Sequence, residues 1–181
     1  YPALQVCERR KGKIVLHRAI GHYRPVGSDL NGWEGADLET RFVLFSLSKC
    51  VAATALHLLF DRAEVKVDDP VYWYLPKFGQ KGKKHITIRH LLTHSAGIPW
   101  IFWDIDVDTF RDWDRIIKTL CAQEPNHFPG RLTGYHTLSS GYLMAEIVER
   151  VTGKPIKEFL EHQLLDPLGF ETFRFGISEN W

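Results

Sequence analysis

The most constraining feature of this sequence is a long apolar stretch that contains a single fully charged residue. Residues 46–60 read SLSKCVAATALHLLF, with no glycine or proline and with many alanines and leucines. This composition predicts a helix that is apolar on nearly all sides and therefore largely buried. Lys49 is its only fully charged residue. Because burying an unpaired ammonium is costly, Lys49 needs either a partner or a function.

Ser46 and Lys49 form a Ser-x-x-Lys pattern at the start of this predicted helix. A spacing of three places both side chains on one helical face, and a helix N-terminus favours negative charge. A desolvated lysine amine is more readily neutral, so it can take the proton of a nucleophilic serine. Two residues at fixed spacing also recur by chance, and a structural lysine bonded to a carbonyl or carboxylate is an alternative interpretation.

Patterns elsewhere predict a mixed α+β fold. Residues 3–8 and 13–18 are short apolar runs around a charged turn that ends in Gly12, which predicts a β-hairpin. Residues 41–45 predict a strand or an extended lead-in. The charged run at residues 81–85 predicts a solvated loop. Helices are predicted over residues 88–93, 108–121, 141–151 and 155–165. A capping threonine precedes the first, helical spacing of apolar residues marks the second, a glycine follows the third, and a proline opens the fourth.

Four blocks of the chain, in order, resemble the serine β-lactamase-like family. They lie within residues 42–49, 67–76, 86–99 and 134–169. The family includes class C β-lactamases, D-alanyl-D-alanine carboxypeptidases and related carboxylesterases, and Ser-x-x-Lys is one of its signatures. The resemblance implies a β-lactamase/transpeptidase-like fold, in which helices pack on an antiparallel sheet beside a mostly helical subdomain.

The resemblance also implies a division of the chain into three regions. We expect residues 1–64 to form the first part of the α/β region with the Ser-x-x-Lys helix. Residues 65–170 would form the mostly helical region that carries a catalytic tyrosine. Residues 171–181 would start the return to a sheet that is incomplete in this chain.

Three catalytic residues follow from the resemblance. Ser46 matches the nucleophile that becomes acylated, and Lys49 matches its basic partner. Tyr135 matches the tyrosine of a Tyr-x-Asn element, which shares proton transfer with the lysine. This chemistry is coherent because a nearby ammonium lowers the pKa of a tyrosine. Taken without the resemblance, Tyr135 reads as an ordinary core or loop aromatic.

The sequence departs from the family at the third position of that element. It reads Tyr135-His136-Thr137, so the asparagine that contacts substrate amides is replaced by threonine. This form is similar to the esterase branch. We take His136, Thr137 and Trp100 as candidate substrate-binding residues. His136 could instead make local hydrogen bonds, and Trp100, near Phe102 and Trp103, could instead pack the helical region.

A second departure is the absence of the family's third element after Tyr135. That element is a Lys-x-Gly, His-x-Gly or Trp-x-Gly triplet on a strand, which supplies one of two oxyanion-hole N–H groups. Removing one such donor typically costs about 10²–10³ in rate. We therefore expect a second chain or a missing segment to complete the domain. A degraded, non-catalytic binding or assembly homologue is the alternative.

Composition limits the other possibilities. The formal net charge is +1, which offers no electrostatic reason to expect nucleic acid, and no apolar run reaches the ~18 residues of a membrane span. The three isolated cysteines predict no disulfide framework and favour a reducing, cytoplasmic compartment. His90 and His94 have helical metal-ligand spacing, but the turn after them argues against a metal site. No metal or cofactor is expected.

The sequence therefore predicts a serine hydrolase that acts through an acyl-enzyme on a small ester or amide. Hydrolysis or transfer of a carboxylic ester is the first expectation. A D-Ala-D-Ala peptidase or a β-lactamase is the alternative within the same enzyme class, and the threonine at position 137 argues against it.

Overall fold

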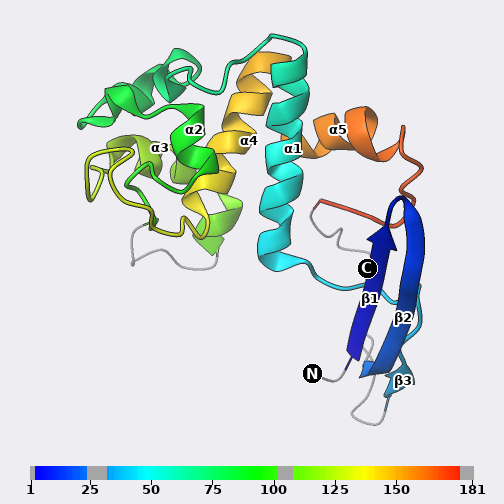
Figure 1. The fold of residues 1–181 in the computed structure, drawn as a ribbon. Helices are drawn as coiled ribbons and strands as arrows, with labels where there is room; N and C mark the ends of the chain where they lie inside the picture. The colour runs from blue at the N-terminus through cyan, green and yellow to red at the C-terminus, as the bar shows by residue number, and fades with distance from the viewer. Residues whose placement is uncertain (1–2, 24–31, 102–107, 176–181) are drawn as a thin grey trace. The chain divides into compact units, whose positions relative to one another are not determined.

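The computed structural model describes residues 3–23, 32–101 and 108–175 (Figure 1). Contacts within it divide the chain into two compact units, Tyr1–Leu44 and Phe45–Trp181. This boundary falls just before the predicted apolar helix, so that helix belongs with the second unit. The division into residues 1–64, 65–170 and 171–181 that was expected from the sequence stays a prediction.

The first unit contains an antiparallel sheet with the strand order β1-β2-β3. The strands are β1 (Ala3–Arg10), β2 (Lys13–Tyr23) and β3 (Glu34–Gly35). Lys11 and Gly12 connect the first two strands with φ angles of 48° and 78°. Positive φ at both positions is the requirement of a type I′ turn, whose twist matches that of the flanking strands. The predicted hairpin is therefore confirmed, with longer strands than the apolar runs suggested.

The segment that leads into the second unit is not a strand. Residues 41–44 are irregular, and Phe45–Leu47 form a 3₁₀ turn that continues into α1 (Ser48–Asp61). Phe45 has a φ of 45°, which breaks the extended backbone that a strand requires. The strand predicted over residues 41–45 is therefore wrong, and the segment ends in a helical turn instead of an extended one.

The helix α1 is buried along one stripe and not on nearly all sides, as its composition predicted. Its buried residues are Ala52, Ala55, Leu56 and Leu59, which recur at spacings of three and four. This stripe lies where α1 contacts α4 (Ser139–Thr152) and α5 (Ile156–Leu160) (Figure 1). Within the described residues, α1 is therefore half-covered, and its remaining apolar side chains are partly accessible.

The other predicted helices form, with local changes at their ends. Thr87 makes a capping box at the start of α2 (Ile88–Leu92). The helix expected over residues 108–121 is split, because Asp112 caps a new start for α3 (Trp113–Ala122). Gly153 ends α4 with a φ of 71°, a conformation that glycine adopts without strain. The segment after α5 finishes in a π turn over Glu161–Leu165.

The core of the second unit is formed where α1, α2, α3 and α4 meet around the short 3₁₀ turns. Its largest fully buried apolar side chains are Leu56, Leu59, Phe78, Ile86, Ile88, Leu91, Ile98, Ile116, Leu120, Leu143 and Ile147. Among the described helices, none has the length and hydrophobicity that a bilayer crossing needs.

The loop expected to be solvated contains a fully buried lysine, so that prediction is wrong at Lys83. The Lys83 ammonium donates to the backbone carbonyl of Cys121 at 2.9 Å and to that of Gln123. Burial lowers the pKa of Lys83. Lys83 therefore links its own loop to the end of α3. The charge pattern of the sequence does not indicate which of the lysines in this loop is buried.

Candidate active site

Ser46 and Lys49 lie together at the start of α1. Ser46 belongs to the 3₁₀ turn and is exposed, and Lys49 is half-buried one residue inside the helix. The Lys49 Nζ atom is 3.2 Å from the Ser46 Oγ atom and donates a hydrogen bond to it. This distance places the Ser46 hydroxyl within hydrogen-bonding reach of a titratable group. The spacing of three therefore does place both side chains on one face.

The backbone around Ser46 is suited to negative charge. Leu47 is the N-cap of α1 and supplies no side-chain hydrogen bond, and a helix N-terminus favours negative charge. Phe45, immediately before Ser46, is in the left-handed region with a φ of 45°, which costs a non-glycine residue about 1 kcal/mol or more. Such strained conformations occur in nucleophile turns, where the backbone aims a reactive side chain outward.

Tyr135 completes the cluster from a loop far along the chain. The Lys49 ammonium lies 4.9 Å from the centroid of the Tyr135 ring. Hydrogen bonds from Ser46 and then Lys49, with the positive charge of Lys49, lower the pKa of the Tyr135 hydroxyl. A lower pKa makes the tyrosinate form of Tyr135 more accessible, and this is the form that can accept a proton from Ser46.

The loop that carries Tyr135 is hydrogen-bonded to the turn after α2. The Gly134 N–H donates to the His94 carbonyl at 3.0 Å. The Ser139 hydroxyl donates to the Ile98 carbonyl at 2.6 Å. Gly97 permits this close approach, because a Cβ atom there would lie 2.6 Å from the His127 carbonyl oxygen. The location of Tyr135 thus depends on hydrogen bonds between two segments that are about forty residues apart in the sequence.

His94 is a site residue that sequence reasoning missed. Its ring lies 4.9 Å from that of Tyr135 and 5.6 Å from that of His136, measured between centroids. Its Nδ1 atom accepts the His136 N–H at 3.2 Å. Burial and then the charge of Lys49 lower the pKa of His94, so the ring is neutral and packs against Tyr135. In the sequence, His94 stood out only by its helical metal-ligand spacing from His90, and the turn after it argued against a metal site.

His90 has a different task, because its Nδ1 atom accepts the Thr87 N–H at 3.1 Å in the cap of α2. Across the described parts of the chain, no group of three or more His, Cys, Asp or Glu side chains could hold a metal ion. The cluster around Ser46 accordingly contains no metal-binding arrangement among these residues.

His136 lies in the interior instead of on the substrate side, which corrects its assignment as a substrate-binding residue. It is fully buried, and its Nε2 atom accepts the Ile98 N–H at 3.1 Å. The proton must then be on Nδ1, which donates to the Gly134 carbonyl at 2.5 Å. Burial lowers the pKa of His136. Both ring nitrogens are thus occupied, and the residue positions the loop that carries Tyr135.

Thr137 and Trp100 are accessible, and their substrate-binding roles stay predictions. Thr137 is exposed and lines a pocket together with Lys49. Trp100 is 48% exposed, and its carbonyl accepts a hydrogen bond from the Gln123 amide at 2.9 Å. Trp100 is not among the residues that line the Lys49 pocket. Phe102 and Trp103, its aromatic neighbours in sequence, lie outside the described residues.

Comparison with known proteins agrees with this geometry. The profile of the family described as Beta-lactamase matches residues 1–181. The chain belongs to the β-lactamase family. A relative within this family is the esterase/beta-lactamase LipL of Mycobacterium tuberculosis, which is 30% identical over 82% of this chain. The family predicted from the sequence is therefore confirmed, and the catalytic roles of Ser46, Lys49 and Tyr135 stay predictions.

Two solved structures share the fold of this chain. A family VIII carboxylesterase superposes with a TM-score of 0.72 at 31% identity over 75% of this chain. A penicillin-binding protein homologue from Caulobacter crescentus superposes with a TM-score of 0.79 at 28% identity over 98% of it. The β-lactamase/transpeptidase-like fold class is thus confirmed. The chain spans 34% of the length of LipL, and 38% and 46% of the two solved chains.

Proposed function

We propose that the protein is a serine hydrolase that cleaves carboxylic esters through an acyl-enzyme. The observation that carries this proposal is the cluster of Ser46, Lys49 and Tyr135. It combines an accessible serine hydroxyl, an ammonium 3.2 Å from it and a tyrosine whose pKa both neighbours lower. A nucleophile within hydrogen-bonding reach of its base, with a third group that tunes the base, is the arrangement required for nucleophilic catalysis.

The proposed reaction has two stages. In the first, the Ser46 Oγ atom attacks the ester carbonyl carbon while its proton passes to the Tyr135 phenolate. The tetrahedral intermediate then expels the alcohol, which takes that proton as the C–O bond breaks. In the second stage, the Tyr135 phenolate removes a proton from water, whose oxygen attacks the acyl-Ser46 carbonyl carbon. The bond between this carbon and the Ser46 Oγ atom then breaks, Tyr135 returns the proton to Oγ, and the carboxylic acid is released. In both stages, the positive charge of Lys49 stabilises the negative charge of the Tyr135 phenolate.

The oxyanion hole is proposed to be shared between this chain and further polypeptide. The Ser46 N–H, at the start of α1, supplies one donor. A second donor on an additional strand, from another chain or from a segment outside this one, completes the site. Separately, the β1–β2 hairpin exposes apolar side chains, which favours covering structure on the hairpin itself. They are Leu4, Ile14, Val15, Leu16 and Ile20.

Ester substrates are favoured over β-lactams and peptides because Thr137 replaces the expected carboxamide beside Lys49. A threonine hydroxyl has neither the reach nor the paired donor and acceptor of an asparagine side chain. Both kinds of relative occur, since the carboxylesterase and the penicillin-binding protein homologue are similarly close to this chain. The two activities must therefore be measured side by side.

For the full-length protein, we expect nitrophenyl acetate to be hydrolysed with a higher kcat/KM than the chromogenic cephalosporin nitrocefin. The same preparation, assayed with both substrates, provides the comparison, and a Thr137→Asn variant tests the cause. Restoring the carboxamide should raise cephalosporin turnover relative to ester turnover. Fast turnover of the cephalosporin alone by the unmodified protein would contradict the esterase proposal in favour of the β-lactamase alternative.

The lowered pKa of Tyr135 predicts a pH dependence of ester hydrolysis. Because the phenolate is the active form, kcat/KM should fall as the pH falls through the pKa of Tyr135. That midpoint should lie below the ordinary tyrosine value of about 10, since Ser46 and Lys49 favour ionisation. A pH–rate profile measures it. Tyr135→Phe should remove this limb and lower the rate by about 10²–10⁴. An unchanged limb in that variant would assign the base to another residue.

A further inference from the structure

His94 contacts three consecutive residues of the loop that carries Tyr135. Its backbone carbonyl accepts the Gly134 N–H at 3.0 Å, and its Nδ1 atom accepts the His136 N–H at 3.2 Å. Between these two bonds, its ring lies 4.9 Å from the Tyr135 ring, measured between centroids. His94 therefore holds the residue before Tyr135, the Tyr135 ring and the residue after it.

The position of His94 at the end of α2 favours glycine and not histidine. The Ser95 N–H donates to the His90 carbonyl at 2.9 Å, and the His94 N–H donates to the Leu91 carbonyl at 3.3 Å, which is the Schellman pattern of a helix end. The residue in this place adopts a left-handed conformation, and the φ angle of His94 is 56°. Glycine adopts it without strain. A strained histidine persists there because its contacts determine the conformation, as occurs at functional sites.

The contacts of His94 depend on a neutral ring. Because Nδ1 accepts the His136 N–H, the ring proton is on Nε2. Within the described residues, the titratable groups that face this ring are Lys49, Tyr135 and His136. Burial and then the charge of Lys49 lower the pKa of His94. A proton added to Nδ1 would turn this acceptor into a donor that faces the His136 N–H, so the bond between them would be lost.

The loop also has attachments that do not depend on the His94 side chain. The His136 Nε2 atom accepts the Ile98 N–H at 3.1 Å, and the Ser139 hydroxyl donates to the Ile98 carbonyl at 2.6 Å. These bonds keep the loop on the turn after α2 when the bond to the His94 ring is lost. Protonation of His94 should therefore change the orientation of Tyr135 and not the fold of the second unit.

We infer that neutral His94 is a positioning residue that holds the Tyr135 hydroxyl beside Ser46, and that protonation of His94 stops ester hydrolysis at acidic pH. The inference rests on the proposed function and adds a regulation of the same site. Proton transfer depends steeply on geometry, so a small displacement of Tyr135 slows the chemical step and leaves substrate binding little changed.

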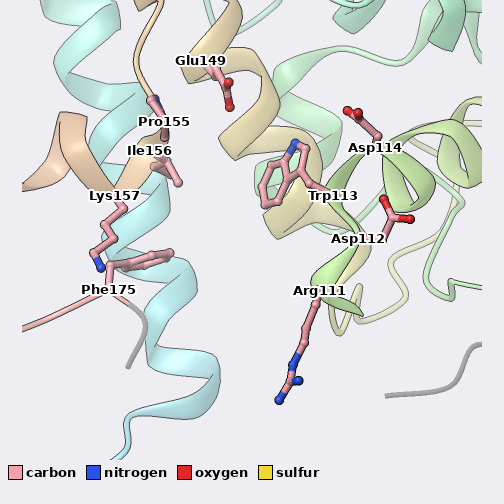
Figure 2. A pocket seen from close by; sticks show the side chains of 9 residues that line it. All are labelled: Arg111, Asp112, Trp113, Asp114, Glu149, Pro155, Ile156, Lys157 and Phe175. Atoms are coloured by element: carbon pink, nitrogen blue, oxygen red, sulfur yellow. The ribbon is translucent and has the colours of Figure 1, made fainter. Parts of the chain in front are cut away.

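A separate group of charged side chains lines a pocket of about 630 Å³ between α3, α4 and α5. Figure 2 shows the carboxylates of Asp112 and Asp114 on one side of the Trp113 indole ring. Neither His94 nor Tyr135 is among the residues that line this pocket. A change of charge there is therefore a control for titration effects that do not act through His94.

The pH dependence of nitrophenyl acetate hydrolysis by the full-length protein tests the inference. Because catalysis requires the Tyr135 phenolate, log kcat/KM should fall with a slope of one below the pKa of Tyr135. The need for neutral His94 adds a second proton, so the slope should rise to two below a midpoint lower than the ordinary histidine value of about 6.5. His94→Asn should keep a slope of one, because asparagine tolerates positive φ and its carbonyl oxygen accepts the His136 N–H without titrating.

His94→Ala removes the acceptor together with the ring. At alkaline pH it should lower kcat by about 10-fold to 100-fold and change KM by less than about threefold, since Tyr135 is misplaced for proton transfer only. His94→Asn should recover most of this kcat. Alanine tolerates the required backbone conformation in this chain, because Ala63 also has a φ angle of 56°. A purely structural role of His94 would lower the denaturant midpoint and leave the kcat of the folded protein unchanged.

Two control variants should keep the rise of the slope to two. His90→Asn replaces another half-buried histidine whose Nδ1 atom accepts a backbone N–H, that of Thr87 at 3.1 Å. Glu149→Gln removes a charge from the pocket of Figure 2. Circular dichroism over the same pH range should show that the fold persists where the activity is lost.

The outcomes separate this inference from the proposed function. If nitrophenyl acetate is not hydrolysed in a Ser46-dependent manner, the proposed function itself fails. If it is hydrolysed but the slope of the unmodified protein stays at one, the regulation by His94 is wrong. A rise of the slope that persists in His94→Asn would assign the second proton to another group, such as His136. An unchanged kcat in His94→Ala would overturn the positioning role.

Discussion

A fluorophosphonate probe should add a single label to the full-length protein, and the Ser46→Ala variant should remain unlabelled. The reason is that the exposed Ser46 hydroxyl lies 3.2 Å from the Lys49 ammonium and beside Tyr135, whose lowered pKa allows it to take the Ser46 proton. Intact-mass spectrometry measures the label. Ester hydrolysis by Ser46→Ala should fall by about 10⁴ or more, as removal of a nucleophile does in comparable enzymes.

The control for this experiment removes a different hydroxyl from the same helix. Thr54 lies on α1 and uses its hydroxyl to bond the Cys50 carbonyl at 2.9 Å. Thr54→Ala should therefore keep both the label and the activity. A label that persists in Ser46→Ala would place the reactive group elsewhere. A full-length protein that no acylating probe labels would favour the non-catalytic binding or assembly alternative over the enzyme.

The second large effect is expected at Lys49. Lys49→Met should slow acylation of Ser46 by about 10²–10⁴, because it removes the group that donates to Ser46 and lowers the pKa of Tyr135. The free energy of unfolding should change by no more than about 0.5 kcal/mol, since Lys49 is half-buried and methionine retains most of its apolar stem. Single-turnover kinetics and denaturant titration measure the two quantities.

Lys83→Met is the matched control, because the same substitution should give the reverse pattern. Lys83 is fully buried and bonds two backbone carbonyls. Its loss leaves those acceptors without a partner, which costs about 1–3 kcal/mol of stability. Acylation by the folded fraction should change little. If Lys49→Met unfolds the protein while the acylation rate of the folded fraction persists, Lys49 is a structural lysine and the proposed mechanism fails.

Much of the fold was predictable because its signals are local. The hairpin could be identified from two apolar runs and a glycine turn, and α1 from a stretch without glycine or proline. The cap of α2 at Thr87 and the end of α4 at Gly153 depend on residues within one turn of the helix end. Such interactions are encoded within a few residues, so no knowledge of the tertiary structure is needed to find them.

The pairing of Ser46 and Lys49 could be predicted for the same reason, because a spacing of three on a helix determines proximity. Tyr135 could be assigned only through its resemblance to a known family. Its distance of 4.9 Å from Lys49 depends on how the loop that carries it is fastened to the turn after α2. Nothing local to Tyr135 distinguishes it from an ordinary surface tyrosine.

The tertiary structure alone decided which polar residues face inward. From the sequence, His136 could be a substrate contact or a local hydrogen-bonding residue, His94 was considered and rejected as a metal ligand, and Lys83 was expected to be solvated. In the structure, His136 and Lys83 are fully buried and bonded to backbone groups, and His94 packs on Tyr135. Each of these interactions joins segments about forty residues apart. The sequence determined the chemical groups and their local helices, but burial depends on long-range packing, which a local pattern does not encode.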